Sequence, residues 1–225
     1  MTLQRNYLKT RRTKKSQPAT SGGSSIGQIR LTRTLPQAAE KNSTTKWIFC
    51  PWLRRAPQDN DVWRSVLPIH DINGTLLAAL PISRRMRHNV YAGVFAVDLL
   101  RTTRELIHHL KRAKIAGVIN FPSVSFIDAE TGAVFSHLSL GIDREVDFLE
   151  ACSRHGLHIA GVVRSPETAK RLLSIGVDFL VAHGGPPTRN NKDPHADAAR
   201  KIREIASPKG VASIPISQLI RSNSY

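Results

Sequence analysis

Three polar residues stand at the ends of apolar, β-branched runs in the second half of the chain: Asp98, Asn120 and His183. A carboxylate in such a place can ligate a divalent cation or act as a base. An amide can orient a substrate carbonyl, and an imidazole can transfer a proton or bind a metal. We therefore predict Asp98, Asn120 and His183 as catalytic residues, with Asp98 also as a metal ligand.

Each of the three also has a purely structural alternative. Asp98 would equally cap a helix that starts at Leu99. Asn120 would form a turn ahead of a proline-containing loop, and His183 would be a buried imidazole hydrogen-bonded to backbone. The chemistry of these residues alone leaves both interpretations open.

An anionic substrate would find four candidate binding residues near the same positions: Arg101, Arg164, Gly184 and Gly185. A guanidinium binds a carboxylate or phosphate through two parallel hydrogen bonds. For Arg101 a surface ion pair is the alternative.

The elements that would position these residues are short buried strands, each followed by a helix-period stretch. The strands are expected at 29–32, 47–50, 90–97, 116–119, 158–163, 178–182 and 211–216, and the helices at 35–41, 74–80, 99–114, 143–155, from 165 and from 193. Strands buried on both faces and joined by helices predict a parallel sheet, whose ligands gather at the carboxyl ends of the strands. A (β/α)8-type barrel and a doubly wound sheet both fit, although no G-x-G-x-x-G motif supports dinucleotide binding.

Composition indicates a single domain over residues 28–216, between a basic tail at 1–27 and a short C-terminal tail at 217–225. The 225 residues carry a formal net charge of +16, and residues 1–39 hold eight Lys or Arg without one acid. Such a stretch is typical of a disordered segment. It is interpreted as a solvated tail, with a nucleic-acid arm or a transit peptide as alternatives, and nucleic acid is not an expected partner beyond it.

Two isolated cysteines, Cys50 and Cys152, do not suffice for a disulfide framework or a zinc site. No apolar run reaches the 18 to 20 or so residues that cross a bilayer. We expect a cytoplasmic protein without membrane association.

Several motifs in a fixed order resemble one known family. Residues 90–101, VYAGVFAVDLLR, are similar to the V-L-A-G-V-x-x-x-D-x-x-R strand of the phosphoenolpyruvate-hydrolase-like TIM-barrel family. This family is also called the TIM-barrel signal-transduction family, and it is related to the phosphoenolpyruvate mutase and isocitrate lyase superfamily. Residues 116–128 (AGVINFPSVSFID), 141–146 (GIDREV) and 181–185 (VAHGG) resemble its A-G-V-x-N-F-P-x-V-x-x-I-D, G-Y-D-x-E-V and V-A-H-x-G motifs.

The resemblance implies a TIM barrel and a lyase or hydrolase that acts on a small keto-acid or phosphoenolpyruvate-like anion. Carbonyl polarisation by Mg²⁺ or Mn²⁺, with His183 as acid or base, would supply the chemistry.

Departures from the family pattern favour an alternative. The Gly-rich turn of the first strand is replaced by residues 31–34, an acidic pair by Ser136-His137, and a Gly-Gly pair falls near 189–191. The chain also ends about where an eighth strand should begin. The alternative is an incomplete, catalytically inactive barrel that serves as a binding or regulatory module, with its open edges covered by a second copy in a homo-oligomer.

Overall fold

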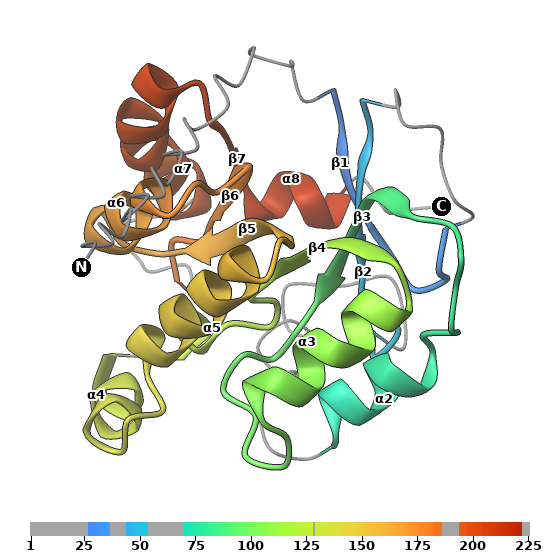
Figure 1. The fold of residues 1–225 in the computed structure, drawn as a ribbon. Helices are drawn as coiled ribbons and strands as arrows, with labels where there is room; N and C mark the ends of the chain where they lie inside the picture. The colour runs from blue at the N-terminus through green and yellow to red at the C-terminus, as the bar shows by residue number, and fades with distance from the viewer. Residues whose placement is uncertain (1–26, 37–43, 54–69, 128, 186–193, 222–225) are drawn as a thin grey trace, which may run out of the picture.

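The fold is seen in a computed structural model, which describes residues 27–36, 44–53, 70–127, 129–185 and 194–221 (Figure 1). The predicted tail at 1–27 lies almost wholly outside these residues, as does the larger part of the helix expected at 35–41.

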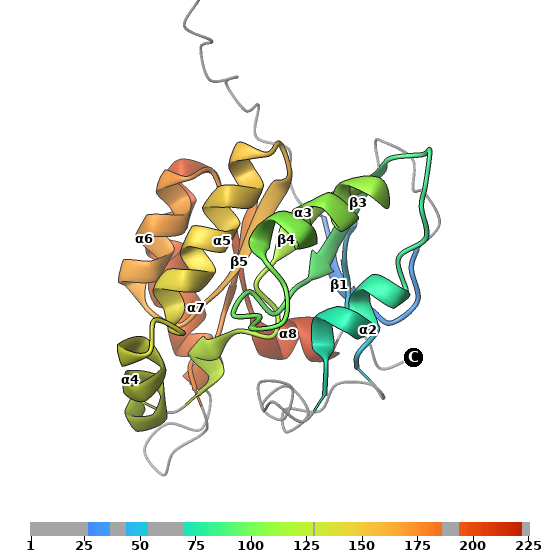
Figure 2. The ribbon, with the colours of Figure 1, turned by 60° about the horizontal axis from the view of Figure 1, so that its bottom comes forward.

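Seven strands form a single parallel sheet in the described part of the chain, and they lie side by side in sequence order. They are β1 (Ile29–Thr32), β2 (Lys46–Phe49), β3 (Arg87–Gly93), β4 (Ile115–Ile119), β5 (His158–Val163), β6 (Phe179–Ala182) and β7 (Ala212–Pro215). A doubly wound sheet reverses its strand order at a switch point, whereas this order never reverses. The sheet curls into a half-barrel, as expected of an incomplete TIM barrel (Figures 1 and 2).

Helices alternate with the strands. They are α2 (Ile72–Ala78), α3 (Thr103–Arg112), α4 (Ala129–His137), α5 (Ile142–Arg154), α6 (Pro166–Ser174), α7 (Pro194–Ala206) and α8 (Ile216–Arg221), with 3-10 turns at Val124–Phe126 and Ser207–Lys209. The expected helix starting at Ser165 is confirmed: Ser165 is the N-cap and Pro166 the first helical residue. Among the described residues, no helix is long and apolar enough to span a membrane.

Alternate residues of each strand enter two different apolar layers, which explains the unbroken apolar runs of the sequence. On β6, Phe179 and Val181 belong to the layer inside the curl. Leu180 and Ala182 instead join the layer between the sheet and the outer helices. Because successive side chains of a strand point to opposite faces, both layers bury the strand.

The start of α3 corrects one expectation. The helix begins at Thr103, with Thr102 as its N-cap in a capping box with Glu105, so Asp98 does not cap it. Leu99 and Leu100 precede the helix and are 72% and 74% exposed. The capping box supplies the free backbone N–H groups of the first turn with acceptors, which an aspartate four residues upstream of Thr102 does not do.

Helices α4 and α8 were not expected from the sequence. Helix α8 follows β7 directly and contacts both β7 and β1, the two edge strands of the sheet. Its Ile216 and Leu219 are buried in the inner layer. The segment expected as a C-terminal tail from 217 therefore contributes, up to Arg221, to the packing of the half-barrel (Figure 1).

Candidate functional site

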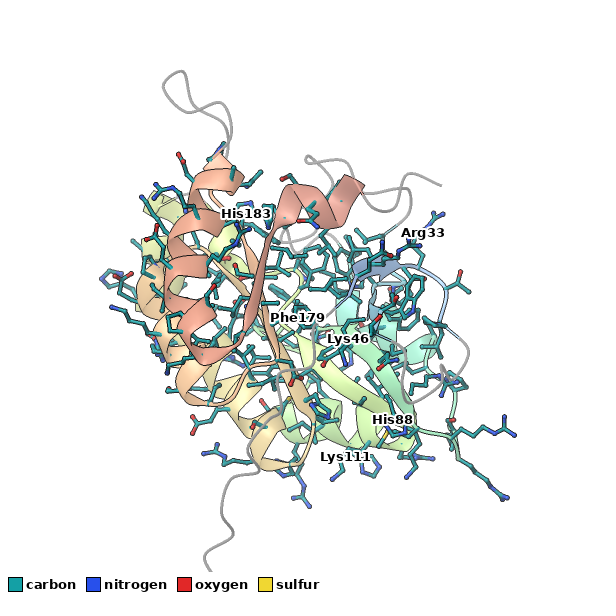
Figure 3. The ribbon with its side chains drawn as sticks, turned by 90° about the horizontal axis from the view of Figure 1, so that it is seen from above. Arg33, Lys46, His88, Lys111, Phe179 and His183 are labelled. Carbon is teal, nitrogen blue, oxygen red and sulfur yellow. The ribbon has the colours of Figure 1, made fainter. Side chains whose placement is uncertain are left out.

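The carboxyl ends of β4, β5 and β6 open onto a cavity of about 580 Å³. Its walls come from the loop after β4, from α4, and from the first turns of α5, α6 and α7. The polar residues among its lining are Ser125, Ser136, Arg164, Ser165, Thr168, Asp197 and Lys201. His183 lies at this end of the sheet, opposite to His88 and Lys111 (Figure 3).

Two cations and one acid line the cavity: Arg164, Lys201 and Asp197. Arg164 follows β5 and donates from a guanidinium nitrogen to the Ile127 carbonyl at 3.3 Å. Its side chain is exposed, as is that of Lys201. The positive end of the α6 dipole lies beside them, because Ser165 caps this helix. The cavity can therefore attract a small anion.

Gly184 and Gly185 shape the wall between β6 and α7. A Cβ on Gly184 would lie 1.8 Å from the Pro194 carbonyl oxygen, so a side chain there would push α7 away. Gly185 has φ +85°, a left-handed conformation that favours glycine, and a Cβ there would lie 3.0 Å from the Arg164 guanidinium. Both glycines let backbone approach closely, and Gly184 lines the cavity itself.

His183 and His195 stack beside these glycines. The His183 ring centroid lies 4.9 Å from that of His195 and 4.5 Å from that of Phe126. The Gly185 N–H donates to His183 Nδ1 at 3.2 Å, and the Gly184 N–H donates to His195 Nδ1 at 3.1 Å. Burial, then the neighbouring His195 and Arg164, lower the pKa of His183 to about 3. His183 is therefore a neutral imidazole at physiological pH.

Asn120 belongs to a buried hydrogen-bond network behind the cavity wall. Its amide nitrogen donates to Glu145 Oε2 at 2.6 Å and to the Val162 carbonyl at 3.2 Å, and its oxygen accepts from the Val162 N–H at 2.7 Å. These bonds connect β4, β5 and α5. They also occupy the amide that was expected to orient a substrate.

Glu145 is the centre of this network. It is fully buried, and it accepts from Ser123 Oγ at 2.7 Å and from the Val124 N–H at 2.7 Å. Burial raises the pKa of Glu145 to about 7, although the hydrogen bonds from Asn120, Ser123 and Val124 act to lower it. Its carboxylate thus holds the segment that leads to Val124 and Ser125, two residues of the cavity wall.

Asp98 and Arg101 lie at a second, more apolar cavity of about 500 Å³, lined mainly by residues 70–73 and 95–100. Asp98 accepts from the Leu100 N–H at 2.7 Å, from the Asn73 amide at 2.8 Å and from Arg101 at 3.3 Å. Arg101 also forms a two-pronged ion pair with Asp71, at 2.8 and 2.5 Å, which lowers the pKa of that carboxyl. The surface ion pair that was the alternative for Arg101 is thus present.

The surroundings of Asp98 do not fit a divalent cation. Both carboxylate oxygens already accept hydrogen bonds, and one of them faces the positive charge of Arg101. Among the residues that the structure describes, no three His, Cys, Asp or Glu side chains come together as a metal site. The expected Mg²⁺ or Mn²⁺ stays a prediction, and no chemical step is derived through it.

The predicted site residues thus divide into two groups. Arg164, Gly184 and Gly185 meet at the larger cavity, with His183 next to them in the chain, whereas Asp98 and Arg101 face the other cavity. Phe135 lines both. Asn120 lies between β4 and β5.

Sequence reasoning missed three residues here: Glu145, His195 and Lys201. A signal existed for Glu145, because it shares the buried stripe of its helix with Leu149 and Cys152 at four- and three-residue spacing. An acid in such a stripe needs buried partners.

The fold and this cavity define a parallel α/β half-barrel with a small-molecule pocket at the carboxyl ends of its strands. The family model for phosphoenolpyruvate hydrolase-like proteins matches residues 59–209, well over half of the 225 residues. The chain belongs to the phosphoenolpyruvate hydrolase-like family.

Relatives include two proteins from distant organisms. An uncharacterized protein y4oT of Sinorhizobium fredii is 36% identical over 117 residues, which cover 52% of this chain and 60% of that protein. The ToMV resistance protein Tm-1(GCR237) of Solanum lycopersicum is 30% identical over 124 residues, which cover 53% of this chain and 16% of that protein. The match therefore spans less than two thirds of either relative.

Proposed function

We propose that this protein binds a small anion of the keto-acid or phosphoenolpyruvate class in the cavity beside Arg164, and that the barrel acts as a binding module. One observation carries the proposal: Arg164 and Lys201 line the same cavity at the carboxyl ends of the strands. A volume of about 580 Å³ suits a small molecule. Such anions carry a carboxylate, and phosphoenolpyruvate adds a phosphate, so two cations match their charge.

Binding is favoured over catalysis because the acidic candidates are engaged in structural hydrogen bonds. Asp98 is held by Asn73 and Arg101, and the Asn120 amide is held by Glu145 and Val162. Asp197 lines the cavity as well, and its charge opposes an anion. We therefore expect the two cations to decide the affinity.

Titration calorimetry with phosphoenolpyruvate, pyruvate and inorganic phosphate tests the proposal. The double variant R164Q/K201Q should bind at least roughly tenfold more weakly, because each hydrogen bond between charged groups contributes about 1.5–3 kcal/mol. The matched control is K170Q/R203Q, which removes two exposed cations from the same helix, α6, and from α7, away from the cavity lining. Equal affinity of the two double variants, or no binding by the native chain, would refute the proposal.

Catalysis is the second candidate, as a hydrolase or lyase reaction on the same class of anion. The neutral imidazole of His183, next to the cavity residue Gly184, favours it, because a neutral imidazole is the form that accepts a proton. Release of phosphate from phosphoenolpyruvate, followed by phosphorus NMR, distinguishes the candidates. An enzyme should lose about 100-fold or more of its rate in H183N, whereas a binding module shows no turnover in the native chain.

A further inference from the structure

A second surface lies at the opposite end of the barrel, where the strands begin. Figure 3 shows Lys111 and His88 at this end, far from His183. We call the exposed cations Arg84, Arg85, Lys111, Arg112 and Lys114 the basic end. Residues 81–97 and 106–118, which contain all five, hold no Asp or Glu.

Backbone hydrogen bonds bring the parts of the basic end together. The Ser83 N–H donates to the Arg112 carbonyl at 3.2 Å, and the Arg87 N–H donates to the Lys114 carbonyl at 2.8 Å. Lys111 Nζ donates to the His155 carbonyl at 3.1 Å, which adds the end of α5. Segments that are far apart in the sequence therefore present their charges on one face.

Few acids compensate this charge. In the described part of the chain, none of the five side chains forms an ion pair with a carboxylate. The acids nearby are already engaged: Asp178 with His158 and Tyr91, and Glu150 with Arg154. The face is thus a concentration of positive charge that still lacks a counter-charge.

We propose that the basic end binds the phosphate backbone of a nucleic acid. Unpaired Lys and Arg side chains gain free energy from phosphates, because binding releases the counterions condensed on the nucleic acid. The formal charge of +16 for the whole chain adds long-range attraction.

Two other partners fit this face less well. A membrane surface needs several large apolar or aromatic side chains that enter the lipid, and the exposed large apolar residues of residues 81–97 are only Ile82 and Met86. A protein interface is centred on apolar and aromatic side chains and is depleted in Lys.

A structural role for part of the charge determines which residues to test. Lys111 and Arg112 lie in the last turn of α3, where a cation complements the negative end of the helix dipole. Arg84 and Arg85 lie outside any helix, so that role does not account for them.

Fluorescence anisotropy with a labelled single-stranded RNA of mixed sequence tests the proposal on the full chain between 50 and 200 mM KCl. R84E/R85E should bind about tenfold more weakly, and the slope of log K against log salt should fall by about 2, one for each lost phosphate contact. The control R104E/K170E makes the same change in net charge with two exposed residues away from this end. It should keep the native slope.

Three outcomes would overturn the proposal. The first is equal weakening in both double variants, which would assign binding to net charge alone. The second is unchanged binding in R84E/R85E, which would assign it to the basic residues before 40. The third is no RNA binding while the native chain cosediments with phosphatidylserine vesicles. Circular dichroism and thermal melts check folding, and R84Q/R85Q repeats the test without introducing negative charge. None of these outcomes depends on the anion cavity.

Discussion

At the scale of single residues, buried polar groups hold the wall of the cavity. Glu145 alone accepts three hydrogen bonds, from Asn120, Ser123 and Val124. A fully buried carboxylate is stable only with such donors, and its loss leaves those donors unpaired. We therefore regard Glu145 as a positioning residue for the loop after β4.

The raised pKa of Glu145 predicts a pH dependence of stability. Because its folded pKa of about 7 exceeds the ordinary value of 4.5, the folded state holds the proton more tightly. This residue's contribution to stability then falls by about 1.4 kcal/mol per pH unit as pH rises from 4.5 to 7. E145Q should be less stable than the native chain by roughly 1–3 kcal/mol at pH 5, and the difference should shrink towards pH 7.5.

Urea denaturation of both proteins at pH 5, 6 and 7.5 measures this difference. The comparison cancels the titration of groups that both proteins share, including His183 and His158. A constant difference across the three pH values would contradict the prediction.

At the scale of elements, the short helix α8 links the two edges of the sheet. It contacts β1 and β7, and its Leu219 is fully buried. Apolar burial of this kind substitutes for part of the packing that a closed barrel provides.

L219A should lower the free energy of unfolding by about 2–5 kcal/mol, because a cavity replaces the lost side chain. The matched control is L138A, since Leu138 is 63% exposed and its removal should cost less than about 0.5 kcal/mol. Chemical denaturation of the two variants checks this. Similar values for both would mean that α8 does not stabilise the half-barrel.

At the scale of the whole molecule, the sheet has two edges rather than none. β1 pairs with β2 alone and β7 with β6 alone among the described strands. Open edges present unpaired backbone groups that attract another chain. The anion cavity and the basic end lie at opposite ends of this sheet, so both can be occupied at once (Figure 3).

The expected homo-oligomer is tested by light scattering coupled to size-exclusion chromatography. We predict a mass that is a multiple of the 24.9 kDa chain, because a second copy would cover the open edges. A mass of 24.9 kDa across the micromolar range would contradict this prediction.

The sequence by itself determined the strands, the parallel sheet and the family. Runs such as 158–163 are apolar throughout, and only burial on both faces accommodates that pattern, so local composition was enough. The turn residues before α6 and the motif at 116–128 had the same local character.

Only the tertiary structure decided which polar residues share a pocket. Asp98, Asn120 and His183 have equivalent places in the sequence, yet their hydrogen-bond partners, Asn73, Glu145 and Gly185, come from different parts of the fold. Helix α8 is buried by contacts with β1, some 190 residues away in the chain. Such contacts depend on distances in space, which a pattern along one chain does not encode locally, and they also gather the five cations of the basic end on a single face.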